Sequence, residues 1–361
     1  MQSEIVINGR FLTRRPSGVD RFAIELLRAW LPGQDPSIRA VMPNRARVVD
    51  TQSFGCPVDA VGTLSGHAWE QFELPRHCGD QLMLNLCSSG PLLRRRQLVV
   101  LHDANPMANP WVFGLAYRNW YRCLFAGLMR RAHLLATVSK FSASELMRYV
   151  GGRSATRIEI IYESGEHILR SPSDAAVLER LSLRDRPYVL AVGNRSPNKN
   201  FAGVVKAAAL LRDHDIQVVA AGGGNSRVFA GTTLTGENLT LAGYVSDGEL
   251  RALYEHAICF VYPSFYEGFG IPPLEAMHCG CPVVASNVSA IPEICGDAAL
   301  YCDPADPADI ARQVEHLLQS RQLRAELRQA GYQRTRQFSW AAAAAQLQGI
   351  VSRGIAGTLY A

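Results

Sequence analysis

Two glutamates frame a glycine-rich loop in the stretch from 257 to 285, AICFVYPSFYEGFGIPPLEAMHCGCPVVA. Glu267 opens the loop EGFG, and Glu275 follows after seven intervening residues. The prolines after the loop favour the start of a helix, whose free N–H groups and dipole suit an anion. Carboxylates are poor phosphate ligands, but they accept hydrogen bonds from hydroxyls. The stretch therefore indicates a site for a diphosphate that carries a ribose and a sugar.

The elements that hold this loop can be inferred from the same stretch. AICFVYP is a short apolar run typical of a buried parallel strand, and CPVVA is the next such run. Gly280 lies where a helix of about two turns, starting at the prolines, would end. The competing interpretation is an ordinary turn with a solvated Glu267 and an unremarkable helical Glu275.

A longer segment around the loop resembles a known enzyme family. EGFGIPPLEAMHCGCPVVAS, continued by NVSAIPEICGDAALYCDPAD, is similar to the signature of glycosyltransferase family 4. That family consists of retaining, nucleotide-sugar-dependent enzymes with the GT-B fold. The resemblance implies that Glu267 holds sugar hydroxyls in a catalytic role and that Glu275 holds the ribose diol. The other residues that it implies for the donor site here are Gly268, Phe269, Gly270 and Ile271.

The segment VGNRSPNKNF resembles the family's glycine loop, which is followed by an arginine–lysine pair that neutralises the diphosphate. Lys199 matches the lysine of that pair. Arg195 stands one residue later than the arginine of many relatives, and Asn194 occupies that place. Arg195 either reaches the same phosphate through its long side chain or is solvated. The resemblance thus implies donor binding by Gly193, Arg195 and Lys199, and catalysis by the two cations.

The opening segment NGRFLTRRPSGVDRF also resembles family 4 enzymes. Gly18 precedes the first expected helix, where a glycine lets the backbone approach a donor closely. A plain helix N-terminus is the competing interpretation. Arg14 and Arg15 are expected on the acceptor side or in solvent.

A histidine–aspartate pair ends the strand expected at QLVVLHD. Ligands of doubly wound folds lie at the carboxyl ends of strands, so this position favours function. The resemblance implies that His102 lies beside the donor sugar as a catalytic residue, and Asp103 is assigned to the acceptor side. A lone histidine, however, is more often structural.

The segment GYVSDGELRALY resembles the strand end that binds the base in this family. The backbone of Tyr244 and Val245 would contact the nucleobase there. Backbone contacts carry little side-chain signal, so the identity of the base stays open. Ser246 and Glu249 form a capping-box pattern that starts the next helix.

Strands alternate with helices along both halves of the chain, which predicts two parallel, doubly wound sheets. The expected fold class is α/β, and specifically GT-B, with two Rossmann-like domains facing a central cleft. The expected boundaries are an acceptor-binding domain at 1–168, a linker at 169–186, a nucleotide-sugar domain at 187–338, and a helix at 339–361 that crosses back toward the first domain.

Length and composition suit a two-domain globular protein. The chain has 361 residues, with 48% hydrophobic and 19% charged residues, and no apolar run long enough for a membrane span. The N-terminus lacks the features of a signal peptide, so a cytoplasmic location is expected. Nine cysteines without a C-x-x-C pair, and a D-x-D at Asp213 and Asp215 that precedes its strand, give no reason to expect a metal or another cofactor.

Charge is uneven between the two halves. Residues 1–170 carry 21 Lys and Arg against 14 Asp and Glu, whereas residues 171–361 carry 16 against 18. A basic first half could contact an anionic membrane at the inner face or an anionic acceptor, and scattered solvated arginines are the alternative. The basic, aromatic segment YRNWYRCLFAGLMRRA is expected to be a core helix with an arginine face rather than a membrane surface helix. Nucleic acid is not an expected partner.

The function implied by the resemblance is a retaining, metal-independent transfer of a hexose. The donor would be a nucleotide diphosphate sugar, with GDP-mannose or a related GDP-deoxyhexose as first candidate, and the acceptor a glycan or lipid-linked glycan in polysaccharide or lipopolysaccharide assembly. Three alternatives remain open: a UDP-hexose-dependent transferase of the same fold, a GT-B sugar-nucleotide epimerase or phosphorylase, and a sugar-binding protein without enzymatic activity.

Overall fold

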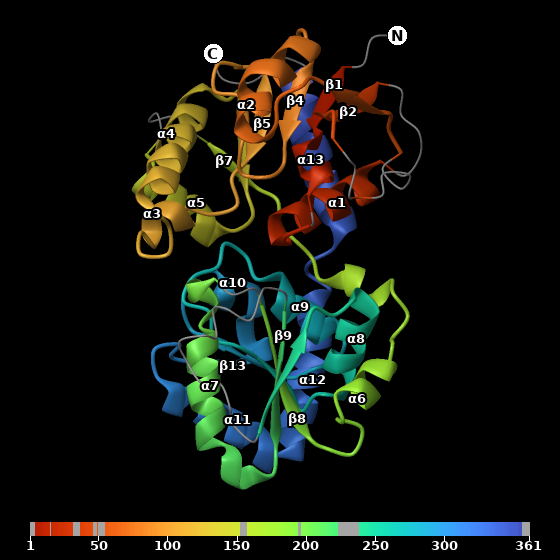
Figure 1. Cartoon of the computed structure of the whole chain (residues 1–361), viewed down its shortest axis with the longest axis vertical. Coiled ribbons are helices and arrows are strands. Elements are labelled where there is room, and N and C mark those ends of the chain that lie inside the picture. The colour runs from red at the N-terminus through yellow and green to blue at the C-terminus, as the bar shows by residue number, and fades with distance from the viewer. Residues whose placement is uncertain are drawn as a thin grey trace. The chain divides into compact units, whose positions relative to one another are not determined.

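The chain folds into two compact units. The computed structural model describes residues 4–14, 16–31, 37–45, 49, 55–151, 157–193, 196–222 and 238–355. Unit 1 comprises Met1–Glu163 and Trp340–Ala361, and unit 2 comprises Ser164–Ser339 (Figure 1). The division follows Glu163, so residues 169–186, expected as a linker, belong to unit 2. Arg15 and Arg195 lie outside the described residues.

The described part of unit 1 contains a seven-stranded parallel sheet in the order β3-β2-β1-β4-β5-β6-β7. Its strands are β1 (Ile5–Asn8), β2 (Ile38–Pro43), β3 (Val58–Val61), β4 (Leu82–Asn85), β5 (Gln97–Val100), β6 (Leu134–Thr137) and β7 (Ile158–Ile160). Its helices are α1 (Gly18–Trp30), α2 (Gly66–Ala68), α3 (Asn105–Ala108), α4 (Leu115–Arg131), α5 (Lys140–Tyr149) and α13 (Trp340–Ile355), with shorter turns η1 (Gly9–Thr13), η3 (Trp69–Glu73) and η4 (Leu74–His77).

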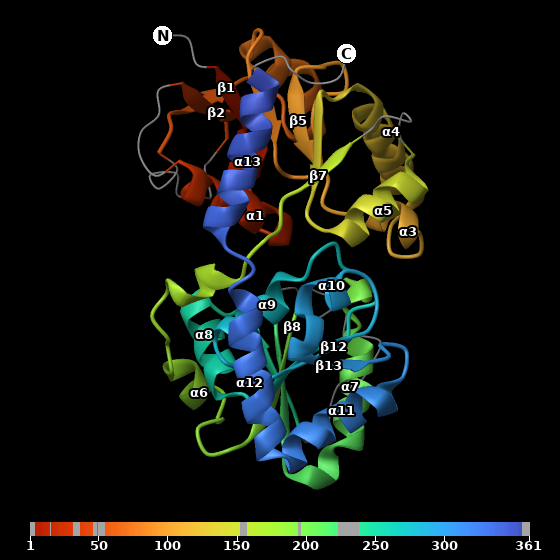
Figure 2. The same ribbon diagram turned by 180° about the vertical axis from the view of Figure 1, so that it is seen from behind.

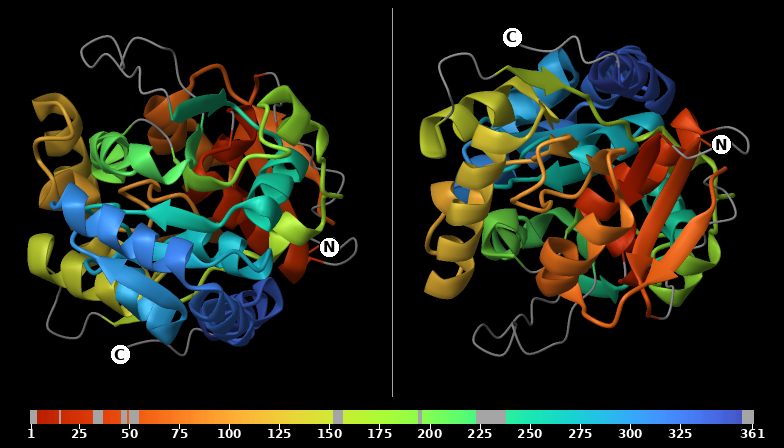
Figure 3. Two further views of the ribbon diagram at one scale, coloured as in Figure 1. Left: turned by 90° about the horizontal axis from the view of Figure 1, so that it is seen from below. Right: turned by 90° about the horizontal axis from the view of Figure 1, so that it is seen from above.

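Helix α13 packs against α1, as Figure 2 shows from behind. The apolar stripe of α1 is buried, and the ring of Phe22 lies 6.2 Å from the ring of Trp340. Trp340 is only 3% exposed, so it anchors the start of α13 in this core. Helices α4 and α5 lie near β7, at the other end of the sheet from β2 (Figure 3).

A buried polar network lies where β1 and β4 end. The carboxylate of Glu70 is completely buried and accepts hydrogen bonds from Asn8 Nδ2 at 2.7 Å and Ser89 Oγ at 2.8 Å. Asn8 also donates to Asn85 Oδ1, the last residue of β4, at 2.9 Å. Burial opposes the charge, but these donors together with His67 and Arg10 hold the pKa of Glu70 below its usual value. The network fixes the strand ends of unit 1 because an unpaired carboxylate there would be costly.

The described part of unit 2 contains a six-stranded parallel sheet in the order β10-β9-β8-β11-β12-β13. Its strands are β8 (Tyr188–Val192), β9 (Gln217–Ala221), β10 (Leu239–Gly243), β11 (Cys259–Tyr262), β12 (Val283–Ser286) and β13 (Ala299–Cys302). Its helices are α6 (Ala176–Arg180), α7 (Phe201–Leu210), α8 (Asp247–His256), α9 (Ile271–His278), α10 (Ile291–Cys295), α11 (Pro307–Gln319) and α12 (Arg321–Thr335), with shorter turns η5 (Glu166–Leu169), η6 (Pro197–Lys199), η7 (Arg212–His214) and η9 (Gly296–Ala298).

Strand β11 shows how the sheet of unit 2 separates its two faces. Successive side chains of a strand point to opposite faces, so Cys259 and Val261 share one face, and Phe260 and Tyr262 share the other. The first pair joins an apolar core with α7 and α11. On the second face, the ring of Tyr254 from α8 packs edge-on against Phe260 at 5.3 Å. Tyr262 therefore points toward the side on which α8 lies.

The two parallel sheets with their helices confirm the predicted α/β fold class. Within the described ranges, no helix combines the length and the apolar character that crossing a bilayer requires.

Candidate active site

The loop before α9 is built as the glycine and proline spacing predicted. Gly270 caps the helix with φ of 113°, a conformation that favours glycine, and a Cβ there would come within 2.7 Å of Ile291. Pro272 and Pro273 occupy the first turn, where a missing N–H costs nothing. The helix ends at His278, and Gly280 follows with φ of 68°. A helix N-terminus therefore opens directly onto the EGFG loop.

Neighbouring backbone and side chains hold the loop in place. The backbone N–H of Glu267 donates to Ser289 Oγ at 3.2 Å, and the carbonyl of Glu267 accepts from Ala290 N at 3.4 Å. Phe269 is buried and meets the ring of Phe338 edge-on at 5.8 Å. Gly268 and Ile271 complete the path of the chain from Glu267 to the helix. The loop is thus a fixed part of unit 2.

Lys199, Glu267 and Tyr262 form a tight cluster at this loop. The Nζ of Lys199 donates to both carboxylate oxygens of Glu267, at 2.7 and 2.9 Å, and to the Tyr262 hydroxyl at 2.9 Å. The hydroxyl of Tyr262 donates in turn to Glu267 Oε1 at 2.9 Å. The Lys199 and Glu267 side chains are 18% and 11% exposed, so the cluster keeps some access to solvent. A ligand can therefore reach a cation and a carboxylate that are already positioned.

The protonation of this cluster follows from its contacts. Burial opposes the charge on Lys199, but the Glu267 carboxylate and Tyr262 raise the pKa of the ammonium group above its ordinary value. Burial and the Glu267 charge also raise the pKa of the Tyr262 hydroxyl, against the opposing effect of Lys199. At neutral pH Lys199 is therefore charged and the Tyr262 hydroxyl is neutral.

The turn that carries Lys199 is fastened to the loop that carries Glu267. Asn198 donates through its side chain to Tyr266 O at 3.0 Å, and its carbonyl accepts from Phe265 N at 2.8 Å. Asn200, with φ of 56°, caps α7 and donates to Pro263 O at 3.1 Å. Buried backbone groups between the two loops are thereby satisfied. The sequence placed both loops at strand ends, and the structure brings their charged side chains together.

Glu275 lies on the buried side of α9. Its Oε1 accepts from His167 Nε2 at 2.8 Å and its Oε2 from the Tyr254 hydroxyl at 3.2 Å. The residue is 8% exposed. Gly165 brings the chain against this helix so closely that a Cβ would lie 2.4 Å from Glu275 N. Both carboxylate oxygens thus have protein partners. A ribose hydroxyl would have to bond to an oxygen that already accepts a hydrogen bond from His167 or Tyr254.

Three further predicted donor residues follow strands of the same sheet. Gly193 follows β8, and its N–H donates to Ala221 O at 3.0 Å. Tyr244 and Val245 follow β10, and Tyr244 is 81% exposed. All three stand at carboxyl ends of parallel strands, where ligands of doubly wound sheets bind. Their roles in donor binding remain predictions.

His102 in unit 1 is buried and engaged through both ring nitrogens. Its Nδ1 lies 3.2 Å from Glu163 Oε1, and its Nε2 donates to Leu86 O at 2.9 Å. The ring of Phe22 contacts it edge-on at 4.8 Å. Burial opposes protonation, but the bond to Glu163 raises the pKa of the imidazole. This arrangement favours a charged His102 held by Glu163, and its catalytic role remains a prediction.

The remaining predicted residues of unit 1 have local partners or open surroundings. Arg14 forms a two-pronged ion pair with Asp20, through Nε at 3.0 and 3.2 Å. Asp103 Oδ1 accepts from Asn105 N at 2.9 Å at the start of α3. A Cβ on Gly18 would meet nothing within 4 Å, so packing alone does not require glycine there.

Sequence reasoning missed Tyr262, Tyr254, His167 and Glu163. Tyr262 ends an apolar strand, and the pattern there indicates only a buried run. Its hydroxyl was the available signal, because a buried tyrosine usually has a hydrogen-bond partner. Tyr254 and His167 carry no local pattern that ties them to Glu275. The distance along the chain, 108 residues between His167 and Glu275, removes any local signal.

The part of the chain that carries this site is similar in sequence to known proteins. A family model described as "Glycosyl transferases group 1" matches residues 178–334. The O-antigen chain mannosyltransferase B of Escherichia coli is 38% identical over 221 residues, which are 58% of this chain and 58% of that protein. The O-antigen chain mannosyltransferase RfbU of Salmonella typhimurium is 28% identical over 220 residues, 60% of this chain and 59% of that one. The chain thus spans under two thirds of the length of these relatives.

Solved structures match the whole chain. Sucrose-phosphate synthase from Thermosynechococcus elongatus superposes with a TM-score of 0.78 at 19% identity, over 99% of this chain and all of that one. WaaG, a glycosyltransferase involved in lipopolysaccharide biosynthesis, superposes with a TM-score of 0.75 at 15% identity, over 96% and 99%. At these identities the likeness establishes the fold alone. Residues 178–334 therefore match the group 1 glycosyl transferase family, the chain has the GT-B fold, and its sequence is similar to those of O-antigen mannosyltransferases.

Proposed function

We propose that this chain transfers a hexose, in the first instance mannose from GDP-mannose or a related GDP-deoxyhexose, to a glycan or lipid-linked glycan. The transfer retains the anomeric configuration, needs no metal, and contributes to O-antigen assembly. The observation that carries the proposal is the Lys199–Glu267–Tyr262 cluster beside the N-terminus of α9. The names of the O-antigen relatives support mannose as the sugar.

The proposed chemistry relies on electrostatic stabilisation of the leaving group. As the bond from the anomeric carbon to the diphosphate breaks, negative charge grows on the diphosphate. Lys199, already charged and held at 2.7 Å from Glu267, stabilises that charge together with the N-terminus of α9. Arg195 adds a second cation in this proposal. A metal ion is then unnecessary, since these groups supply the positive potential.

The donor's hydroxyls are proposed to bind the two glutamates. Glu267 accepts from a sugar hydroxyl at its loop, and Glu275 accepts from the ribose diol. The acceptor hydroxyl enters on the face from which the diphosphate leaves, and a phosphate oxygen takes its proton. Configuration is retained because bond making and bond breaking occur on one face.

The first experiment tests the reaction and the nucleobase together. A ligand at about 100 times its dissociation constant adds about 2.7 kcal/mol to the free energy of unfolding, so a thermal-shift panel of GDP, UDP, ADP and dTDP should single out GDP. Nucleoside diphosphate should then be released from the GDP-sugar only when a glycan acceptor is present, and EDTA should not reduce the rate. UDP selectivity would redirect the proposal to a UDP-hexose. Release that requires no acceptor, or activity restored only by manganese, would contradict transfer as proposed.

We further propose that α4 makes peripheral contact with an anionic membrane surface. One side of the helix packs into the core of unit 1 through Leu124, Phe125 and Leu128, as the core-helix interpretation predicted. Tyr117 and Trp120 are exposed on the same face nearer the start of the helix, and Arg122 and Arg130 are exposed away from it. The helix carries four arginines and no acidic residue, which complements an anionic lipid surface.

Vesicle sedimentation tests this contact. Each arginine near an anionic surface contributes about 1 kcal/mol, so the Arg122→Ala/Arg130→Ala variant should bind phosphatidylglycerol vesicles at least about tenfold more weakly than wild type. Binding should also fall with added salt. Arg312→Ala/Arg321→Ala in unit 2 removes the same charge and should bind as wild type does. Wild-type protein that binds neutral vesicles as well as anionic ones would contradict the role of α4. The same loss of vesicle binding in both double variants would also contradict it.

A further inference from the structure

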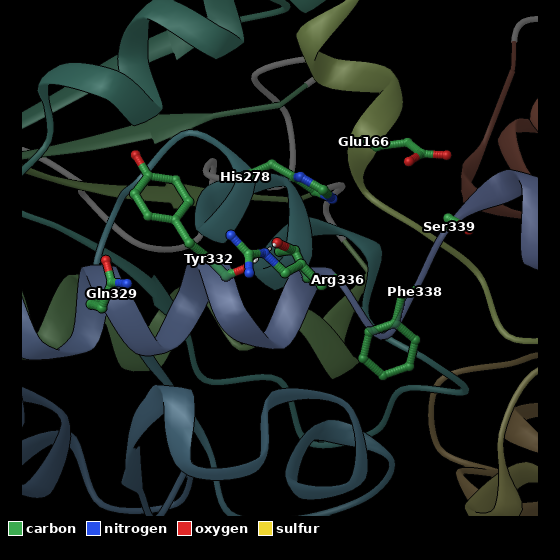
Figure 4. A pocket seen from close by; sticks show the side chains of 8 residues that line it. Glu166, His278, Gln329, Tyr332, Arg336, Phe338 and Ser339 are labelled. Carbon is green, nitrogen blue, oxygen red and sulfur yellow. Dashed lines mark hydrogen bonds between the residues drawn. The ribbon is translucent and has the colours of Figure 1, made fainter.

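A pocket lies in unit 2 between α9 and the end of α12, and its lining includes no residue of the Lys199 cluster. Its volume is about 440 Å³, within the range of pockets that hold small ligands. The residues that define this α9–α12 pocket include Glu166, His278, Gln329, Tyr332, Arg336 and Phe338. Figure 4 shows Gln329, Tyr332 and Arg336 along one helix, with His278 across from them and Glu166 to one side.

The helix spacing explains why three polar side chains share this wall. Residues 329, 332 and 336 follow one another at three and four positions, which places them on one face of α12 and its C-cap. Tyr332 is 40% exposed, so part of its surface is open to a ligand. Gly280 leaves the room that the Tyr332 hydroxyl needs, because a Cβ there would lie 2.2 Å from that oxygen.

His278 adds a polar atom that no described residue satisfies. Its Nε2 is buried and has no hydrogen-bond partner among the described residues. Burial, together with the neighbouring His167, lowers the pKa of His278 to about 4, so the ring is neutral at pH 7. A neutral imidazole offers one donor and one acceptor. A buried nitrogen without a partner among the described residues is therefore open to a hydrogen bond from a ligand.

The hydrogen-bonding groups that line the pocket indicate which class of ligand fits it. Arg336 can only donate hydrogen bonds, the Glu166 carboxylate can only accept them, and His278 does one of each. A phosphate or carboxylate would suit Arg336 but would be repelled by Glu166, and an ammonium group would have the reverse difficulty. A hydroxyl both donates and accepts, so a compound with several hydroxyls satisfies all of them.

We propose that the α9–α12 pocket binds an uncharged sugar ring. The apolar face of the ring lies on Tyr332, and its hydroxyls bond to Arg336 and Glu166. A further hydroxyl satisfies His278 Nε2. The ligand class is a neutral hexose or a unit of a neutral glycan chain, held apart from the donor. This site goes beyond the proposed transfer reaction, and it can be tested without donor or turnover.

Titration by isothermal calorimetry and saturation-transfer NMR tests the site. The probes are α-linked mannobiose and maltose, with glucose 6-phosphate and glucosamine as charged counterparts. Hydrogen bonds to charged groups contribute about 1.5–3 kcal/mol, so Arg336→Ala should weaken binding of a neutral disaccharide about tenfold or more. His278→Leu should also weaken it. Arg321→Ala, at the far end of the same helix, is the matched control and should bind as wild type does.

Each other outcome overturns a definite part of the proposal. Binding that is lost in Lys199→Ala but kept in Arg336→Ala would assign the sugar to the Lys199 site instead. Tighter binding of glucose 6-phosphate or glucosamine than of the neutral probes would contradict the ligand class. No saturable binding of any probe to wild type would remove the site altogether. Because Arg336 is exposed, its variant should fold normally, and circular dichroism checks this.

Discussion

Lys199→Ala should lower kcat by about 100- to 1000-fold while nucleoside diphosphate binding falls much less. The reason is that charge on the leaving diphosphate is greatest in the transition state, where Lys199 acts most strongly. The structure adds that Lys199 is held in place by both oxygens of Glu267 and by Tyr262.

Tyr262→Phe removes one of these bonds and should lower kcat by a smaller factor, because Lys199 keeps its charge. Single-turnover kinetics at saturating donor measures both effects.

The chain offers a matched control for the lysine. Lys206 lies on α7, seven residues beyond Lys199, and is exposed. Lys206→Ala removes the same charge from the helix that follows Lys199 and should keep the wild-type kcat. The loss of the Lys199 cation also leaves Glu267 without its counterion, so Lys199→Ala must be shown to be folded at the assay temperature. A folded Lys199→Ala enzyme within about threefold of wild-type kcat would exclude Lys199 from the proposed stabilisation of the leaving diphosphate.

The parts of the site that could be predicted are those set by local backbone geometry. Gly270 and Gly280 have the positive φ that the loop and the helix end require, and Pro272 and Pro273 fit a first turn. These constraints act over a few residues, so they are visible in sequence. Strand β3, in contrast, has only a weak pattern in the sequence, because its four residues lie at the sheet edge and are partly buried or exposed.

The parts that could not be predicted depend on contacts between distant residues. Glu70 is buried with Asn8 and Ser89, which lie 62 and 19 residues away, and nothing near Glu70 in sequence indicates a buried acid. Likewise the family motifs assign separate roles to Lys199 and Glu267, whereas in the structure these two residues form one ion pair to which Tyr262 is hydrogen-bonded. Chain folding, rather than spacing, creates such pairs.

Glu275 combines a structural role with the proposed ribose contact, and two variants separate them. Glu275→Ala leaves the buried Tyr254 hydroxyl without its acceptor and breaks the bond from His167. Each buried group left unpaired costs about 1–3 kcal/mol, so this variant should lose free energy of unfolding. Glu275→Gln keeps the volume and one oxygen acceptor, and should be the more stable of the two. Urea unfolding of the two variants and the wild type under the same conditions measures the difference in free energy of unfolding.

Nucleotide affinity then decides the ribose role. If Glu275 accepts hydrogen bonds from the ribose diol, folded Glu275→Gln should bind nucleoside diphosphate about 1.5–3 kcal/mol more weakly, a loss of roughly tenfold or more. Tyr254→Phe is the control, because it removes a partner of the carboxylate but leaves the carboxylate itself. It should lower stability and change affinity little. A folded Glu275→Gln that binds nucleoside diphosphate as tightly as wild type would leave Glu275 only its bonds to His167 and Tyr254, and the second glutamate of the motif would then serve to hold α9 to its neighbours.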